Sequence, residues 1–81
     1  MRVRIRLLGT AQHSIDTDLL RVEDTAIGKV AVVANQFANS GESRYRVSDG
    51  RSLDDNDRPT AWNFWELSAE SRRRITEGDE G

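Results

Sequence analysis

The side chains that most often perform catalysis are few in this sequence and lie close together in the chain. His13 is the only histidine, and Ser14 and Asp16 follow it almost directly. A serine, a histidine and an aspartate can form a catalytic triad, but near-consecutive loop residues do not reach the geometry that a triad needs. The sequence also lacks the motif that exposes a serine nucleophile between a strand and a helix. We therefore expect no catalytic residue and no enzyme.

Carboxylates gather in one polar segment that contains Asp54, Asp55 and Asp57. Carboxylate oxygens bind Ca²⁺, but this spacing lacks the turn glycine and the distal glutamate of an EF-hand loop. The chain has no cysteine, which excludes thiolate ligands and disulfides. It also shows no glycine-rich phosphate-binding pattern. We therefore expect neither a metal site nor a cofactor.

Binding chemistry is indicated instead by arginines at alternate positions in two segments. Residues 2–7 read RVRIRL, and residues 44–48 read RYRVS directly before the pair Asp49-Gly50. Alternating polar and apolar residues are typical of a strand with one buried face, and Asp-Gly is typical of a hairpin turn. Because successive side chains point to opposite faces, the arginines of both segments should point away from the core.

The elements that position these arginines follow from the pattern of apolar residues. In chain order we expect strands at 2–8 and 14–22, a helix at 26–39, a strand at 44–48, a short return strand containing Leu53, and an aromatic-rich strand at 61–67. Leu20 and Val22 should face the core. Ile15 and Leu19 have the opposite parity, which predicts a bulge or a register change between them in the second strand.

This order of strand-strand-helix-strand-strand-strand predicts an α+β fold of the β-grasp type, a mixed four- to five-stranded sheet packed on one helix. Residues 1–67 would form the domain, and residues 68–81 a short helical turn and a flexible C-terminal tail. The last strand would lie between the two arginine-bearing strands. If Trp62 and Phe64 fill the core, Asn63 and Trp65 point outward between the arginines.

Residues 1–67 resemble the ubiquitin-like β-grasp superfamily, in particular small bacterial ubiquitin-like proteins. The opening MRVRIRLLGT is similar to the first strand and turn of ubiquitin, and VEDTAIGKV resembles its strand-to-helix junction. ANSGES, followed by RYRVSDGRSLDD, is similar to the helix exit and next strand of the bacterial proteins. The resemblance implies a domain that binds other proteins. Leu8 matches one residue of the apolar patch of ubiquitin, whereas Arg44 and Arg46 replace apolar residues there.

The C-terminus departs from the resemblance. Ubiquitin-like modifiers end in paired glycines that an adenylating enzyme activates, whereas this chain ends in TEGDEG, with single glycines at Gly78 and Gly81. Conjugation through either glycine stays open as an alternative function.

The leading prediction is a non-catalytic protein-binding module that presents an arginine and tryptophan face, together with a flexible tail, to a protein partner. The predicted partner-binding residues are Arg4, Arg6, Leu8, Arg44, Arg46, Asn63 and Trp65. An indole among guanidinium groups gains cation–π contacts, and both residue types are frequent in binding hot spots. Two alternatives stay open: a phage or mobile-element inhibitor of a larger complex, and a structural domain whose arginines are merely balanced by neighbouring acids while Trp65 is buried.

Composition narrows the choice of partner. The 81 residues carry a formal net charge of −2, which argues against nucleic acid as the ligand. No apolar run approaches the roughly 18 residues of a membrane span, so we expect no membrane association and a cytoplasmic location. The oligomeric state is left open by the sequence, with a monomer expected.

Overall fold

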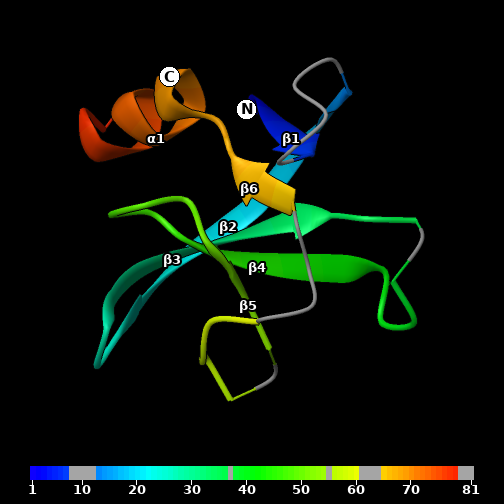
Figure 1. Ribbon diagram of the computed structural model, residues 1–81. Helices are drawn as coiled ribbons and strands as arrows, with labels where there is room; N and C mark the ends of the chain where they lie inside the picture. Colours follow the sequence, from blue (N-terminus) through cyan, green and yellow to red (C-terminus); the bar gives the residue numbers. More distant parts are fainter. Residues whose placement is uncertain (8–12, 37, 55, 61–64, 79–81) are drawn as a thin grey trace.

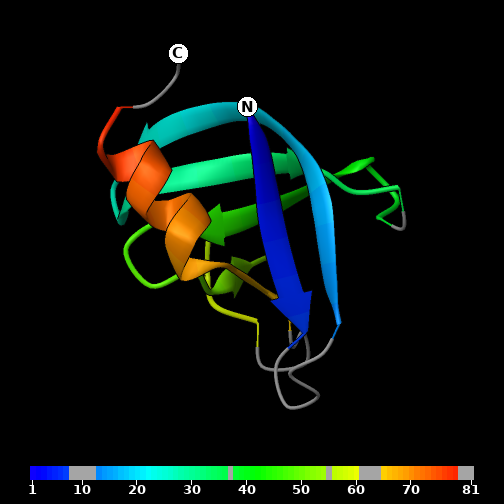
Figure 2. The same ribbon diagram turned by 90° about the horizontal axis from the view of Figure 1, so that it is seen from above.

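A computed structural model describes residues 1–7, 13–36, 38–54, 56–60 and 65–78 (Figure 1). Its elements are β1 (Arg2–Leu7), β2 (Ser14–Thr25), β3 (Gly28–Ala34), β4 (Glu42–Arg46), β5 (Ser52–Leu53), β6 (Trp65–Leu67) and α1 (Ala69–Thr76). The strands form one sheet in the order β5-β4-β3-β2-β1-β6, and each neighbouring pair is antiparallel. The sheet curls into a nearly closed, barrel-like shape, and Figure 2 looks down into it.

The sheet closes where β6 reaches the hairpin formed by β4 and β5. β6 pairs with β1 on one side, with Leu67 opposite Ile5. On its other side an isolated bridge joins Glu66 to Arg51, just before β5. The N–H of Leu67 also donates to the carbonyl oxygen of Gly50 at 2.8 Å. The last strand therefore links the first strand to the β4–β5 hairpin, so that one core lies inside the curled sheet.

The predicted β-grasp fold is wrong, because residues 26–39 do not form a helix packed on a sheet. Residues 25–28 make a turn between β2 and β3, and Gly28 adopts a φ of 104° there. β3 is rich in valine, whose branched Cβ favours strands. Val30, Ala31, Val32 and Val33 all have 0% exposure, because β3 lies between β2 and β4 and both of its faces are covered. A strand buried on both faces shows no polar alternation, so its period cannot be read from the sequence.

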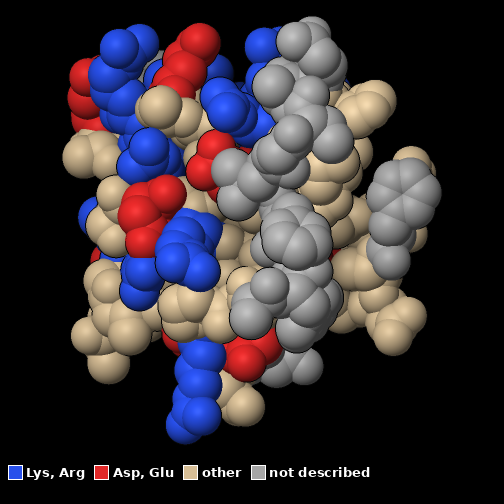
Figure 3. Space-filling model, viewed as in Figure 1, with Lys and Arg blue, Asp and Glu red and all other residues tan. Residues whose placement is uncertain are grey.

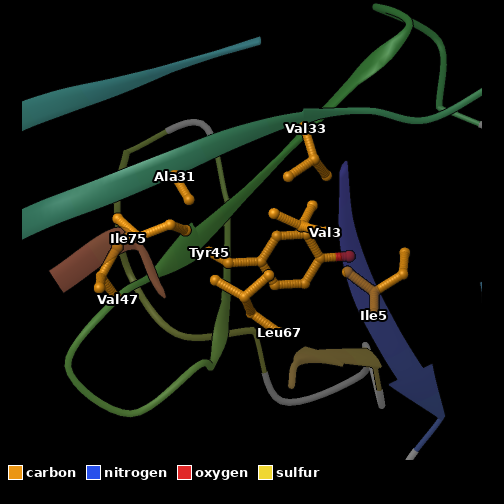
Figure 4. Close-up of a cluster of buried hydrophobic side chains, with 8 residues drawn as sticks. All are labelled: Val3, Ile5, Ala31, Val33, Tyr45, Val47, Leu67 and Ile75. Carbon is orange, nitrogen blue, oxygen red and sulfur yellow. The ribbon is translucent and has the colours of Figure 1, made fainter. Parts of the chain in front are cut away.

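The core consists of side chains from the concave face of the sheet and one from α1. The buried cluster contains Val3, Ile5, Ala31, Val33, Tyr45, Val47, Leu67 and Ile75 (Figure 4). The first predicted strand is thus confirmed over Arg2–Leu7, with Val3 and Ile5 inside. The prediction that Leu20 and Val22 face the core is wrong, since their side chains are 46% and 39% exposed.

The second strand contains the predicted irregularity, displaced along the chain. The register between β2 and β3 shifts between Leu19 and Arg21, whereas the sequence placed a bulge between Ile15 and Leu19. As a result Leu19 packs against the core cluster and Leu20 does not.

The helix α1 runs beside β1 rather than across the sheet. Ser68 caps it by accepting a hydrogen bond from the N–H of Ser71. The N–H of Ser68 donates to the carbonyl oxygen of Arg4 at 2.9 Å, and the N–H of Arg4 donates to Ser71 Oγ at 2.9 Å. Arg74 Nη1 donates to the carbonyl oxygen of Arg2 at 3.2 Å. Beyond the end of β6, α1 therefore covers the edge of β1. Within the described residues, no helix has the length and apolar character needed to cross a membrane.

Candidate functional site

The outward side of β6 carries a carboxylate instead of an indole. Leu67 is fully buried, and Trp65, two residues earlier, is half-buried and packs against the same core cluster. Glu66 lies between them in sequence and points outward, with its carboxylate 3.3 Å from Arg6 Nε. The structure therefore corrects the outward placement predicted for Trp65, and Glu66 takes that place.

The arginines of β4 lie over valines of β3. Directly opposed residues in an antiparallel pair project on the same side, so Arg44 lies beside Val32 and Arg46 beside Val30. Both valines are fully buried although neither belongs to the core cluster. Arginine stems can cover apolar surface while the guanidinium group stays in water. The β4 arginines therefore shield the outer side of β3.

Carboxylates hold Arg44 in place over this apolar surface. Its Nη2 lies 2.9 Å from Glu23, and its Nε lies 2.7 Å from Asp57. Glu23 also accepts a hydrogen bond from Arg21 Nε at 2.8 Å, and Arg21 reaches Glu42 at 3.1 Å. These hydrogen bonds from Arg21 and Arg44 lower the pKa of Glu23. Arg44 thus belongs to a network satisfied within the chain.

Arg46 is held by the turn that follows β4. Its guanidinium group pairs with Asp49, and the N–H of Arg51 donates to the same carboxylate at 3.1 Å. The hydrogen bond from Arg46 is the main reason why the pKa of Asp49 is lowered. Both β4 arginines therefore fit the alternative in which outward charges are balanced by neighbouring acids.

The arginines of β1 are more accessible and form a ladder of ion pairs. The three pairs are Arg2 with Asp18 at 3.0 Å, Arg4 with Asp16 at 2.8 Å, and Arg6 with Glu66 at 3.3 Å. At least half of each arginine side chain is exposed. The hydrogen bond from Arg4 lowers the pKa of Asp16. Exposed pairs of this kind are weak because water solvates both partners well.

The β1 arginines line a groove of about 500 Å³ beside the start of α1, which is called the β1–α1 groove below. Its charged lining consists of Arg2, Arg4 and Arg6 from β1, Arg74 and Glu70 from α1, and Asp16 from β2. The lining thus holds four guanidinium groups and two carboxylates, and two further carboxylates outside the lining, Asp18 and Glu66, pair with Arg2 and Arg6. Figure 3 shows one face of the molecule, on which basic and acidic side chains lie next to one another.

Of the remaining predicted residues, those that the structure describes do not line this groove. Leu8, Asn63 and Gly81 lie outside the described residues. Gly78 follows α1 and is exposed. His13 is exposed, and its carbonyl oxygen accepts the N–H of Leu7 at 2.9 Å.

The acidic loop is organised by its own backbone. Asp54 accepts hydrogen bonds from the N–H groups of Asn56 and Arg58 at 2.8 and 3.0 Å, and these bonds lower its pKa, the bond from Arg58 most strongly. Asp55 lies outside the described residues. Over the described ranges, no group of three or more histidine, cysteine, aspartate or glutamate side chains is placed to hold a metal ion.

Sequence reasoning missed two features of the surface. One is the contribution of Arg74, which could not be foreseen because it depends on α1 packing beside β1. The other is an exposed apolar region around Leu20 and Val22. The opposite parity of Ile15 and Leu19 could have indicated this exposed region, because the residues that follow a bulge point to the other side of the strand.

Comparison of the chain with known protein families, curated proteins and solved structures gives no match. The resemblance to the ubiquitin-like superfamily is therefore tested by none of these comparisons, and function has to be argued from the geometry of the described residues.

Proposed function

We propose that this chain is a non-catalytic protein-binding module whose β1–α1 groove receives an acidic segment of a protein partner. The observation that carries the proposal is the meeting of four arginines from two elements in one open groove. Arginine binds carboxylates with two parallel hydrogen bonds in a fixed plane. Several arginines in a row therefore suit a segment that carries several carboxylates.

The groove supplies its arginines at fixed positions. Arg2, Arg4 and Arg6 alternate along one strand. The hydrogen bonds that join β1 to Ser68, Ser71 and Arg74 tie α1 to that strand. A partner therefore meets a largely preorganised surface, which reduces the entropy lost on binding.

Carboxylates of a partner can replace the aspartates that pair with the β1 arginines. Asp16 and Asp18 are themselves exposed, with about half or more of each side chain accessible. Their pairs with Arg4 and Arg2 cost little to open, because water solvates all four charges. Arg4 and Arg6 thus keep the partner-binding role predicted from the sequence, whereas the arginines of β4 serve stability.

A protein partner suits the groove better than a nucleic acid does. Phosphate backbones bind through many uncompensated positive charges, and here Asp16 and Glu70 lie within the groove itself. No described feature favours conjugation through Gly78 or a role as a phage inhibitor over this proposal.

The test is binding of a fluorescent, glutamate-rich peptide, measured by anisotropy at low and moderate salt. We expect Arg4→Ala and Arg74→Ala each to weaken binding about tenfold, the effect of losing one charge-assisted contact. Arg73→Ala is the matched control, because Arg73 neighbours Arg74 on α1 but does not line the groove.

Two results would contradict the proposal. Equal losses for Arg73→Ala and Arg74→Ala would show attraction to net charge alone. Tighter binding of a single-stranded oligonucleotide with the same number of charges would favour nucleic acid as the ligand. Circular dichroism of each variant shows whether the fold is kept.

A further inference from the structure

The second half of β2 leaves one strand edge open. β2 pairs with β1 over residues 14–18 and with β3 over residues 19–25. The carbonyl oxygen of Met1 accepts the N–H of Leu19 at 2.8 Å. Past this point, β3 is the only strand in the described part of the chain that pairs with β2. Among the described strands, residues 20–25 therefore pair on one side only.

The hydrogen-bond pattern identifies the backbone groups on the open edge. The carbonyl oxygen of Lys29 accepts the N–H of Val47 at 3.0 Å, so Lys29 and Ala31 direct their backbone groups away from β2. Their partners on β2 are Asp24 and Val22. Because these two pairs are not hydrogen-bonded, the N–H and C=O groups of Asp24 and Val22 point to the open edge.

Exposed apolar side chains lie beside this edge. Leu20 and Val22 are 46% and 39% exposed, and both line a groove of about 630 Å³. Met1, Leu19 and Ile75 form other parts of its wall. A strand edge beside apolar surface is a place where another strand can add, with main-chain hydrogen bonds and buried side chains.

We propose that this edge pairs, antiparallel, with the same edge of a second copy of the chain, with the two-fold axis at Val22. Each Val22 N–H then donates to the Val22 carbonyl oxygen of the other copy. On the groove side Val22 of one copy lies opposite Val22 of the other, and each Leu20 lies diagonal to the other copy's Val22 and opposite its Asp24. The interface is self-complementary, as a two-fold interface must be.

Charge selects both the partner and this register. With the axis at Val22, Arg21 lies directly opposite Glu23 of the second copy, and this pair occurs twice. Shifting the register by two residues places Arg21 opposite Arg21, or Glu23 opposite Glu23. Opposite charges stabilise an antiparallel pair and like charges destabilise it. The register centred on Val22 therefore avoids like-charge contacts of Arg21 and Glu23 between the copies, in addition to the ion pairs that both residues form within their own chain.

The pairing is separate from the β1–α1 groove, because none of the groove arginines takes part in it. The paired segment is short and its interface is small, so we expect a dissociation constant of roughly 10–1000 μM. This weak dimer replaces the monomer expected from the sequence.

Sedimentation velocity from about 10 μM to about 1 mM tests the pairing. The unmodified chain should pass from monomer to dimer with rising concentration. Val22→Lys and Val22→Asp should each be monomeric, because each places like charges at the axis, while an equimolar mixture of the two should associate. Ile15→Lys is the matched control: Ile15 is 37% exposed on the same strand, in the half already paired with β1, so this variant should dimerise like the unmodified chain.

A chain that remains monomeric at the highest concentration would overturn the proposal. So would a folded Val22→Lys variant that dimerises normally, or folded variants whose mixture stays monomeric. If the Val22 variants do not fold, the amide signals of the unmodified chain decide: Val22 and Asp24 should shift on dilution, and constant signals refute the pairing.

Discussion

Replacing Gly50 with alanine tests how the sheet is closed. Gly50 has a φ of +79°, and its carbonyl oxygen accepts the N–H of Leu67. A Cβ at this position would lie 2.5 Å from the Leu67 carbonyl oxygen and 3.1 Å from Arg72 Cδ. The first of these contacts is with backbone, so either β6 or the β4–β5 hairpin must move to accept the methyl group.

The size of the effect follows from two contributions. A left-handed backbone costs an alanine about 1–2 kcal/mol, and displacing packed backbone adds about 1–3 kcal/mol. Gly41→Ala is the matched control, because Gly41 has a φ of +78° and open space where its Cβ would lie. The free energy of unfolding of Gly41→Ala should therefore fall only by the cost of the left-handed backbone. For a domain of this size each kcal/mol lowers the melting temperature by roughly 4–8 °C.

Urea unfolding followed by far-ultraviolet circular dichroism, on both variants and the unmodified chain, measures this difference. We expect Gly50→Ala to lose about 1–3 kcal/mol more than Gly41→Ala. Equal losses would refute the close approach of Gly50 to β6, and with it the closure of the sheet at this point.

Two further predictions concern single buried groups. Burial raises the pKa of Tyr45 to about 12, so the folded chain holds the phenol proton more tightly than the unfolded chain, whose tyrosine titrates near about 10. Stability should be intact below about pH 10 and fall by up to about 1.4 kcal/mol per pH unit towards pH 12, and Tyr45→Phe should remove this slope in urea unfolding. Ser71→Ala should cost about 1–3 kcal/mol, because the backbone N–H of Arg4 loses its acceptor. Thr76→Ala, at an exposed position of α1, should change stability by less than about 0.5 kcal/mol, and equal losses would refute the role of Ser71.

The strands with one exposed face could be predicted from the sequence. β1 alternates strictly, so its arginines and its buried Val3 and Ile5 follow directly from the two-residue period. β3 could not be predicted in this way, because Val30 to Val33 are buried on both faces and resemble a helical stripe equally well. The error in the fold class follows from this single segment.

The sequence does not show which side chains of the last strand point into the core. In AWNFWEL, tryptophan occurs at Trp62 and Trp65, on opposite parities, so either set of side chains could fill the core. In the structure, Leu67 and Trp65 pack against the core, and Glu66 points outward beside Arg6. An indole at the predicted surface is thereby replaced with a carboxylate.

Only part of the candidate site could be predicted from the sequence. The outward direction of Arg4 and Arg6 could be predicted, but their neighbours depend on register and on which elements pack together. Arg4 meets Asp16 because these residues pair across β1 and β2. Arg74 joins them because α1 follows the edge of β1. Such contacts between distant segments carry no local pattern.

The proposed pairing of two copies requires residues 28–34 to form a strand that pairs with the second half of β2. Nuclear Overhauser contacts between α-protons test this most directly. Val22 and Ala31 form a pair without mutual hydrogen bonds, the type in which the α-carbons lie closest. A strong contact between the Val22 and Ala31 α-protons is the predicted result. Its absence, together with contacts from the Ala31 α-proton to the Ala34 amide proton, would show a helix and contradict both the observed sheet and the pairing of two copies.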